Sequence, residues 1–229
     1  MLASVGHAAS EDDPPSQTAQ VWTYASAQGD ISALRYQVET NLRAQLDPGP
    51  KLLRVELSPA IGATVVGGLS LWAAYTRVEQ FGGEPDEHRP WQQVLYEHRF
   101  GSFRLVGRAR VEERFVEGSG SPALRLRALV RASVPLYGPH FRLRAQQEIF
   151  FHLAGSADTQ RGFDQSRSEL ALQVHSSRWF VATLGYLLRV SSGGQFDHVA
   201  LLELTLRAPP GEKPKTPDDT LVDLLLPGG

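Results

Sequence analysis

The chain has 229 residues, of which 41% are hydrophobic and 21% charged, and its formal net charge is -2. This balance argues against a general nucleic-acid-binding protein, which would carry a strongly basic surface. The chain has no cysteine, which excludes a disulfide framework and thiolate chemistry. It has no run of 18 apolar residues, so it predicts no transmembrane helix. The length is compatible with a single domain.

The first 19 residues are predicted to lie outside the folded domain. Met1–Ser10 resembles the end of a secretory signal, with Gly-His-Ala at 6–8 as a candidate cleavage site, but it lacks the basic region and most of the apolar region. A start codon placed too late would explain this. The alternative is a disordered N-terminal arm. Residues 11–18 are polar and contain proline, as expected after a cleavage site.

From residue 20 to 207 the chain alternates apolar and polar residues, and a period of two predicts β-strands with one apolar and one polar face. Pro59 is expected to end one strand, and residues 77–89 and 155–163 are expected to form long loops. The candidate strands cover residues 20–27, 34–46, 53–57, 63–76, 87–100, 103–115, 123–136, 141–153, 168–174, 180–188 and 198–206.

Short turns between neighbouring candidates predict antiparallel, up-and-down connectivity. The turns alternate between short ones, such as Gly101 and 137–139, and longer ones, as in outer-membrane barrels. A barrel with both ends on the same side of a membrane needs an even number of strands. We therefore expect that one of the eleven candidates is miscounted, or that 20–27 is not a full strand.

The polar faces carry an unusual density of arginine and glutamate. The three lysines, Lys51, Lys213 and Lys215, lie at or beyond strand ends, so every cation within a strand is arginine. The planar guanidinium group suits pairing with carboxylates in a confined interior; codon bias in a GC-rich genome is the alternative explanation. The predicted charge network of the lumen comprises Glu97, Arg99, Arg104, Arg108, Arg110, Glu112, Arg114, Arg125, Arg127, Arg131, Arg142, Arg144, Glu148, Arg167 and Glu169.

Alternation alone does not tell which face is inside, because a soluble lipocalin-like barrel would turn its leucines inward. Several predicted strands run for about 12 to 15 residues, more than the 9–11 that cross a bilayer. Aromatic residues gather near strand ends on the apolar face, as in interfacial girdles. We therefore predict an all-β, antiparallel up-and-down transmembrane β-barrel of about 10–12 strands with an Arg- and Glu-rich lumen. Its expected location is the bacterial outer membrane.

Several motifs carry a family resemblance. They are E-H-R-P-W-Q-Q (87–93), R-A-R-V-E-E-R-F (108–115), R-L-R (125–127), G-F-D-Q-S-R (162–167), H-V-A-L-L-E-L (198–204) and an early W-T (22–23). Together they resemble the bacterial family catalogued as domain of unknown function 2490, over about residues 21–207. The resemblance implies an outer-membrane β-barrel, with membrane lipid and the barrel assembly machinery as partners. It implies no activity.

The predicted barrel, residues 20–207, departs from outer-membrane barrels in its ending. Such barrels usually finish on an aromatic residue, whereas the last strand here ends Leu206-Arg207. The tail, residues 208–229, is rich in proline and then reads T-L-V-D-L-L-L-P. It is predicted to be a flexible linker with a short apolar segment, or simply a disordered extension.

The sequence contains no nucleophile elbow, P-loop, H-E-x-x-H or EF-hand motif, and it predicts no cofactor or metal site. The charged lumen has two explanations: a site for an anion such as a lipid phosphate or small acid, or a structural network that fills a narrow barrel. His152 and Glu148 could form an acid–base pair. The predicted function is an outer-membrane barrel with a structural, narrow-pore or binding role. The alternatives are an outer-membrane enzyme acting on lipid or lipopolysaccharide and a soluble lipocalin-like binding barrel.

Overall fold

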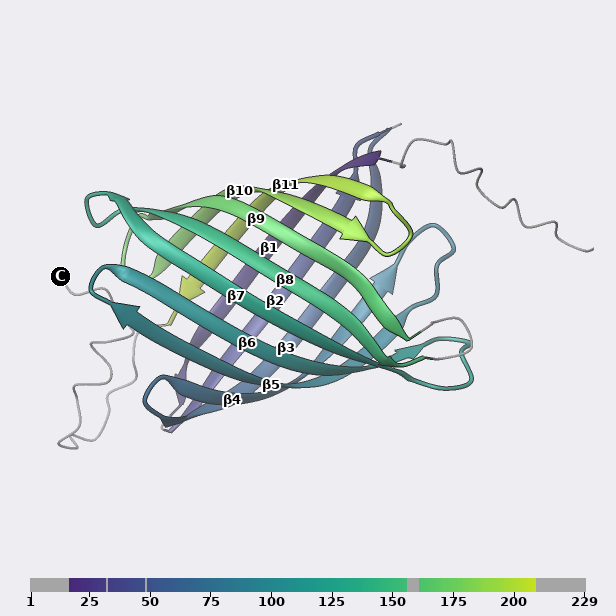
Figure 1. The fold of residues 1–229 in the computed structure, drawn as a ribbon, viewed down its shortest axis with the longest axis horizontal. Coiled ribbons are helices and arrows are strands. Elements are labelled where there is room, and N and C mark those ends of the chain that lie inside the picture. Colours follow the sequence, from purple (N-terminus) through teal and green to yellow (C-terminus); the bar gives the residue numbers. More distant parts are fainter. Residues whose placement is uncertain (1–16, 32, 48, 156–160, 209–229) are drawn as a thin grey trace, which may run out of the picture.

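The computed structural model describes residues 17–31, 33–47, 49–155 and 161–208. The described chain forms a closed barrel of eleven β-strands (Figure 1), which confirms the predicted all-β barrel. Among these residues, no helix has the length and apolar character needed to cross a membrane. The strands are β1 (Gln17–Ile31), β2 (Leu34–Gln45), β3 (Lys51–Val66), β4 (Leu69–Gln80), β5 (Glu87–Phe100), β6 (Phe103–Val116), β7 (Ala123–Tyr137), β8 (Phe141–Ala154), β9 (Gly162–His175), β10 (Phe180–Ser191) and β11 (Phe196–Arg207).

The barrel closes through a parallel pair. Consecutive strands pair antiparallel, whereas β1 and β11 pair in parallel, from Gln17 opposite Phe196 to Gln28 opposite Arg207. The expectation of an even strand number is therefore wrong, and residues 20–27 belong to a full strand. A parallel ladder offers evenly spaced hydrogen bonds, so the two edges can pair without being joined by a hairpin.

Side chains reinforce this closing seam from inside. Trp22 on β1 is fully buried in the lumen, where it packs in an apolar cluster with β10 and β11. Ser26 donates a hydrogen bond to Thr205 across the seam, with 3.2 Å between the oxygens. The seam therefore combines backbone pairing with packing of one large aromatic ring. The cluster around Trp22 contains Leu187, Val199 and Leu201, with Tyr24 packed against it.

Two predicted boundaries are wrong near the third strand. Pro59 lies inside β3, at a point where pairing with β4 passes from Leu57 to Ala60, so its missing N–H is tolerated. The stretch predicted as one strand over 63–76 contains a turn at Gly67 and Gly68, whose positive φ angles of 45° and 86° suit a tight hairpin. A third correction concerns the loop predicted over 77–89, which is confined to 81–86 because β4 and β5 extend into it.

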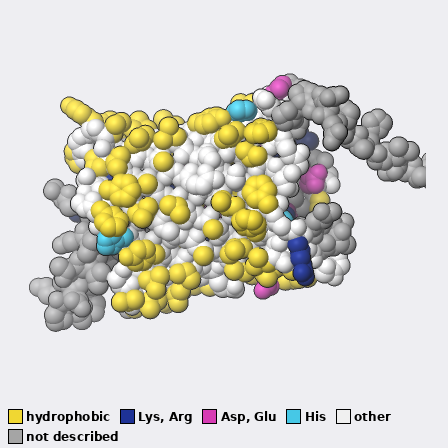
Figure 2. All heavy atoms as spheres, viewed as in Figure 1, with side chains coloured by type: hydrophobic (Ala, Val, Ile, Leu, Met, Phe, Trp, Pro, Cys, Tyr) yellow, Lys and Arg dark blue, Asp and Glu magenta, His cyan; other side chains and the backbone are white. Residues whose placement is uncertain are grey.

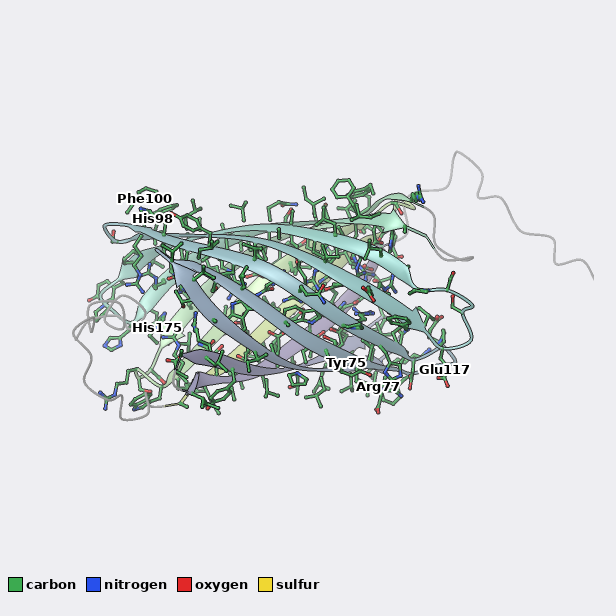
Figure 3. The ribbon with its side chains drawn as sticks, turned by 90° about the horizontal axis from the view of Figure 1, so that it is seen from below. Tyr75, Arg77, His98, Phe100, Glu117 and His175 are labelled. Atoms are coloured by element: carbon green, nitrogen blue, oxygen red, sulfur yellow. The ribbon has the colours of Figure 1, made fainter. Side chains whose placement is uncertain are left out.

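The two ends of the barrel differ in their connections. The short-turn end has the connections at 32–33, 67–68, 101–102, 138–140 and 176–179, and the long-loop end has those at 46–50, 81–86, 117–122, 155–161 and 192–195. Because the strand number is odd, β1 begins at the long-loop end and β11 finishes at the short-turn end. Figure 3 shows Phe100 and His175 at one end and Glu117 at the other.

The outer wall of the barrel is apolar. On the face shown in Figure 2, apolar side chains cover the wall between the ends, and the charged side chains lie near the ends. Large aliphatic residues such as Val130 and Leu184, each 57% exposed, project from the middle of their strands. Tyr36, Phe100, Phe103 and Phe141 are near the short-turn end, and Phe115 is near the long-loop end. The molecule thus reverses the usual arrangement of a soluble protein.

Candidate functional site: the lumen

Successive side chains of a strand point to opposite faces, and all fifteen residues of the predicted charge network lie on the face that points into the lumen. Most are buried or half-buried there. The structure divides them into a central network, which crosses the lumen, and two sets at the ends of the barrel.

Glu112 on β6 is the centre of the network and is 2% exposed. Its Oε2 accepts a hydrogen bond from Nη2 of Arg125 at 2.6 Å, and its Oε1 accepts one from Nη1 of Arg127 at 2.6 Å. Arg110 lies farther away, with 3.6 Å between Nη1 and Oε1. The predicted cross-strand pairing of Glu112 with an arginine of the next strand is confirmed, and it involves both candidates.

Glu148 on β8 extends the network. Its Oε1 accepts a hydrogen bond from Arg127, whose Nη2 lies 2.8 Å away. It also pairs with Arg108 of β6, which is not a neighbouring strand. Arg127 therefore joins two buried carboxylates, and the chain from Arg108 to Arg125 ties three strands together across the interior.

Arg144 on β8, 1% exposed, spans a longer path. Its guanidinium group lies 2.6 Å from Glu169 of β9 and 2.8 Å from Glu203 of β11. Two strands separate β8 from β11 in the wall. A guanidinium group with two carboxylate partners is well satisfied electrostatically, because each charged hydrogen bond offsets part of the cost of burial.

The aromatic part of the lumen was not predicted from the sequence. The guanidinium carbon of Arg43 lies 3.8 Å from the ring centre of Trp22, and that of Arg110 lies 3.7 Å from Trp91. Stacking on an aromatic face stabilises a guanidinium group without a carboxylate. A usable signal existed, since Trp91 alternates in register with the charged Glu87 and must share its face.

Arg167 is held by aromatic rings instead of carboxylates. Its guanidinium carbon lies 4.4 Å from the ring centre of Phe150 and 4.9 Å from that of Trp22. Both rings are fully buried. Among the described residues no carboxylate forms an ion pair with Arg167, and its side chain donates instead to Gln165. Aromatic faces therefore hold part of the arginine excess in the lumen.

At the long-loop end, cations and carboxylates are paired. Glu87 accepts hydrogen bonds from Arg89 at 2.7 Å and from Arg114 at 2.9 Å. The acid–base pair that His152 could have formed with Glu148 does not occur, because Glu148 is engaged by Arg108 and Arg127. His152 Nε2 instead lies 3.4 Å from Asp164. The β8–β9 pairing shifts register between Phe150 and Phe151, so that Asp164 has no partner in the ladder. This irregularity gives the Asp164 carboxylate access to His152.

At the short-turn end, carboxylates are scarce. Glu97 lies 2.6 Å from Arg104 and 3.9 Å from Arg99. Arg142 donates to the backbone carbonyl oxygens of Ser102 and Ser133, at 2.9 Å and 3.3 Å. Slightly deeper, Arg131 donates to the side-chain oxygen of Gln146 at 2.7 Å.

No cluster of three or more His, Cys, Asp or Glu side chains suited to a metal ion occurs within the described parts of the chain. A family model described as "Protein of unknown function (DUF2490)" matches residues 19–198. The chain belongs to this family. Comparisons with curated proteins and with solved structures give no match. The DUF2490 barrel directs into its lumen most of the charged residues of the motifs that carry the resemblance, including Glu87, Arg89, Arg108 and Arg125, whereas Glu113 is exposed on the outer face.

Proposed function

We propose that this DUF2490 protein is an outer-membrane β-barrel whose lumen is closed at mid-height, so that it serves as a structural or binding barrel and not as a diffusion pore. The observation that carries the proposal is the reversed distribution of polarity. Large aliphatic side chains lie on the outside, and Glu112, Glu148 and Arg144 lie buried inside. Such a wall is stable where its surroundings are as apolar as the wall itself.

The dimensions of the strands support the membrane setting. Each strand has 12 to 16 residues, and a tilted strand needs only about 9–11 to cross the hydrocarbon core. Exposed aromatic residues near both ends, such as Phe100 and Phe115, suit the two interfaces of a bilayer. A lipocalin-like barrel would require the apolar face inside, and the buried charged residues argue against it.

The closed lumen rests on contacts between strands that are not neighbours. Arg108 on β6 reaches Glu148 on β8, and Arg144 on β8 reaches Glu203 on β11. Small barrels are narrow enough for such side chains to meet and fill the interior. The rings of Trp22 and Phe150 add bulk at the same level, linked through Arg167.

The connections favour one orientation. Outer-membrane barrels have short periplasmic turns and longer external loops. The short-turn end would then face the periplasm, and the connections at 81–86 and 117–122 would face outward. Of the predicted N-terminal segment, residues 1–19, and the predicted tail, 208–229, residues 1–16 and 209–229 lie outside the described residues, and 17–19 belong to β1.

Two measurements test this function separately. The full chain, expressed with a secretory signal, is expected to fractionate with the outer membrane and to migrate faster on gels when unboiled. Recovery as a soluble monomer without detergent would overturn the membrane location and favour the lipocalin-like alternative. In planar bilayers the wild type is expected to show no porin-like steps of conductance. Steady open-channel currents would refute the closed lumen and leave the membrane location standing.

A further inference from the structure

The lumen-facing side chains at the short-turn end form a cationic mouth. Arg99 and Arg104 lie directly opposite each other in the β5–β6 ladder, and like charges in that position destabilise a sheet. Arg142 of β8 and Arg207 of β11 bring two further guanidinium groups. Glu97 is the carboxylate that pairs with this set, through Arg99 and Arg104. We call these five residues the short-turn mouth.

The members of the short-turn mouth come from different strands but act on one another. Arg142 of β8 donates a hydrogen bond to the backbone carbonyl of Ser102, in the turn between Arg99 and Arg104, which places its guanidinium group against the β5–β6 hairpin. Arg207 ends β11 at the same end of the barrel. His175, at the end of β9, lies opposite Val181 of β10 and is also at this end. Figure 3 shows His175 at this end of the barrel. The repulsion is therefore shared across the mouth and is not confined to one pair of strands.

The opposite end provides the contrast. There Glu87 serves both Arg89 and Arg114, and Arg189 pairs with the buried Asp197. Arg35, which also lies at the short-turn end, has a partner of its own in Asp30, at 3.6 Å. At the long-loop end Arg43, Arg54 and Arg89 share Glu56, but Arg89 is also held by Glu87. At the short-turn mouth Glu97 is the one carboxylate among the described residues that pairs with the four arginines.

Hydrogen-bond donors at the short-turn mouth remain without partners. Among the described residues, no acceptor binds Nε of Arg99, Arg104 or Arg207, or Nε2 of His175, although these atoms are shielded from solvent. A buried donor without an acceptor costs free energy comparable to a lost hydrogen bond. In an arginine the Nε–H and one Nη–H form the edge that grips two oxygens at once. Three Nε–H donors are therefore available at one mouth, although Nη2 of Arg104 already donates to Glu97 at 2.6 Å.

We propose that the short-turn mouth binds a small multivalent oxyanion of the phosphate class. Such an anion supplies several oxygens to the free Nε–H donors, and its charge offsets the mutual repulsion of Arg99, Arg104, Arg142 and Arg207. A monovalent ion such as chloride offers neither several acceptors nor enough charge. The mouth would face the periplasm only if the orientation proposed above holds; the binding itself does not depend on it.

The experiment uses the full chain folded in zwitterionic detergent. Titration calorimetry and thermal unfolding are measured with sodium phosphate, with sodium sulfate, and with sodium chloride at equal ionic strength. A short-chain phosphatidic acid below its micelle concentration tests whether a lipid-borne phosphate enters as well. Arg142→Gln and Arg207→Gln remove site cations. Arg114→Gln at the long-loop end is the matched control, because Glu87 keeps Arg89 as its partner.

Phosphate is expected to bind the wild type saturably and to raise its melting temperature, whereas chloride does neither. Each site variant should weaken binding at least tenfold and, without phosphate, melt no lower than the wild type, since repulsion is relieved. Arg114→Gln should bind phosphate like the wild type.

No saturable binding by the wild type, or equal weakening in Arg114→Gln, would overturn the proposal. If Arg142→Gln fails to fold, Arg207→Gln decides, because Nε of Arg207 has no acceptor within the described structure. The measurement is made in detergent, so a failed membrane fractionation would leave its outcome unaffected.

Discussion

Arg144 on β8 lies 2.8 Å from Glu203 on β11, measured between Nη2 and Oε2. Since β9 and β10 lie between these strands in the wall, the contact ties two separate parts of the barrel through its interior. The same guanidinium group holds Glu169 at 2.6 Å. Buried pairs of this kind contribute little net stability when intact, but they are costly to break because one charge is left alone.

Glu112→Gln tests the central network. Its carboxylate accepts hydrogen bonds from Arg125 and Arg127, and its loss leaves confined guanidinium groups unbalanced. We expect the free energy of unfolding in detergent to fall by about 3–5 kcal/mol. Glu113→Gln is the matched control, because Glu113 is exposed on the outer face and should change stability little. Equal effects of the two substitutions would mean that Glu112 carries no special role in the network.

Val130→Arg tests the outer face. Val130 lies near the middle of β7 and is 57% exposed, so the proposed location puts it close to the centre of the bilayer. An arginine there should cost about 2–4 kcal/mol, against about 0–1 kcal/mol near an interface. Leu136→Arg, near the end of the same strand, supplies that comparison. Unfolding in lipid vesicles measures both, and the absence of any dependence on depth would contradict the lipid-facing wall.

Trp22→Ala tests the closing seam. The ring is fully buried and packs on residues of β10 and β11, so its removal leaves a cavity and frees Arg43. Truncation of a buried aromatic residue costs about 3–5 kcal/mol. Trp179→Ala, in the turn between β9 and β10, changes the same residue type away from the seam and should cost much less. Denaturant unfolding distinguishes them; similar losses would argue that the seam depends on backbone pairing alone.

Gly62→Ala tests the packing of Trp72. An added Cβ at Gly62 would lie 2.3 Å from Cδ2 of the Trp72 ring, and overpacking of this kind costs about 1–3 kcal/mol. Adding Trp72→Leu should restore much of the loss, giving a coupling in a double-mutant cycle. Gly107→Ala is the control, because a Cβ there meets no atom within 4 Å. Additive effects of the Gly62 and Trp72 changes would refute direct contact.

The period of two was enough to predict most strands and the faces of their residues. That is why Glu112, Arg127 and Arg144 could be placed in the lumen without coordinates. Alternation is a local property, set by the geometry of each strand. Where a residue broke the local pattern, as Pro59 does within β3, the prediction failed, since tolerance of a proline depends on which neighbouring hydrogen bonds are absent.

Neither the way in which the barrel closes nor the ion-pair partners of its buried charges could be predicted from the sequence. Eleven candidate strands were counted from the sequence, but an even number was expected. The parallel pairing of β1 with β11, which closes an odd-numbered barrel, depends on how two distant edges meet, and alternation does not reveal it. Likewise the link from Arg144 to Glu203 joins residues 59 positions apart. The burial of Trp22 was predictable in principle, since it alternates in register with Gln20, and both are buried. Large rings had instead been expected on the outer face.

The parallel seam also determines how this barrel can be attached to anything else. In many domains the two termini lie close together, and circular permutation is tolerated. Here Gln17 and Arg207 lie at opposite ends of the seam. A peptide joining them would have to run beside 12 paired positions, about 40 Å of extended chain at roughly 3.3 Å per residue. Two modules fused to the two ends would therefore be held apart by the full length of the barrel, and the fold would work as a rigid spacer between them.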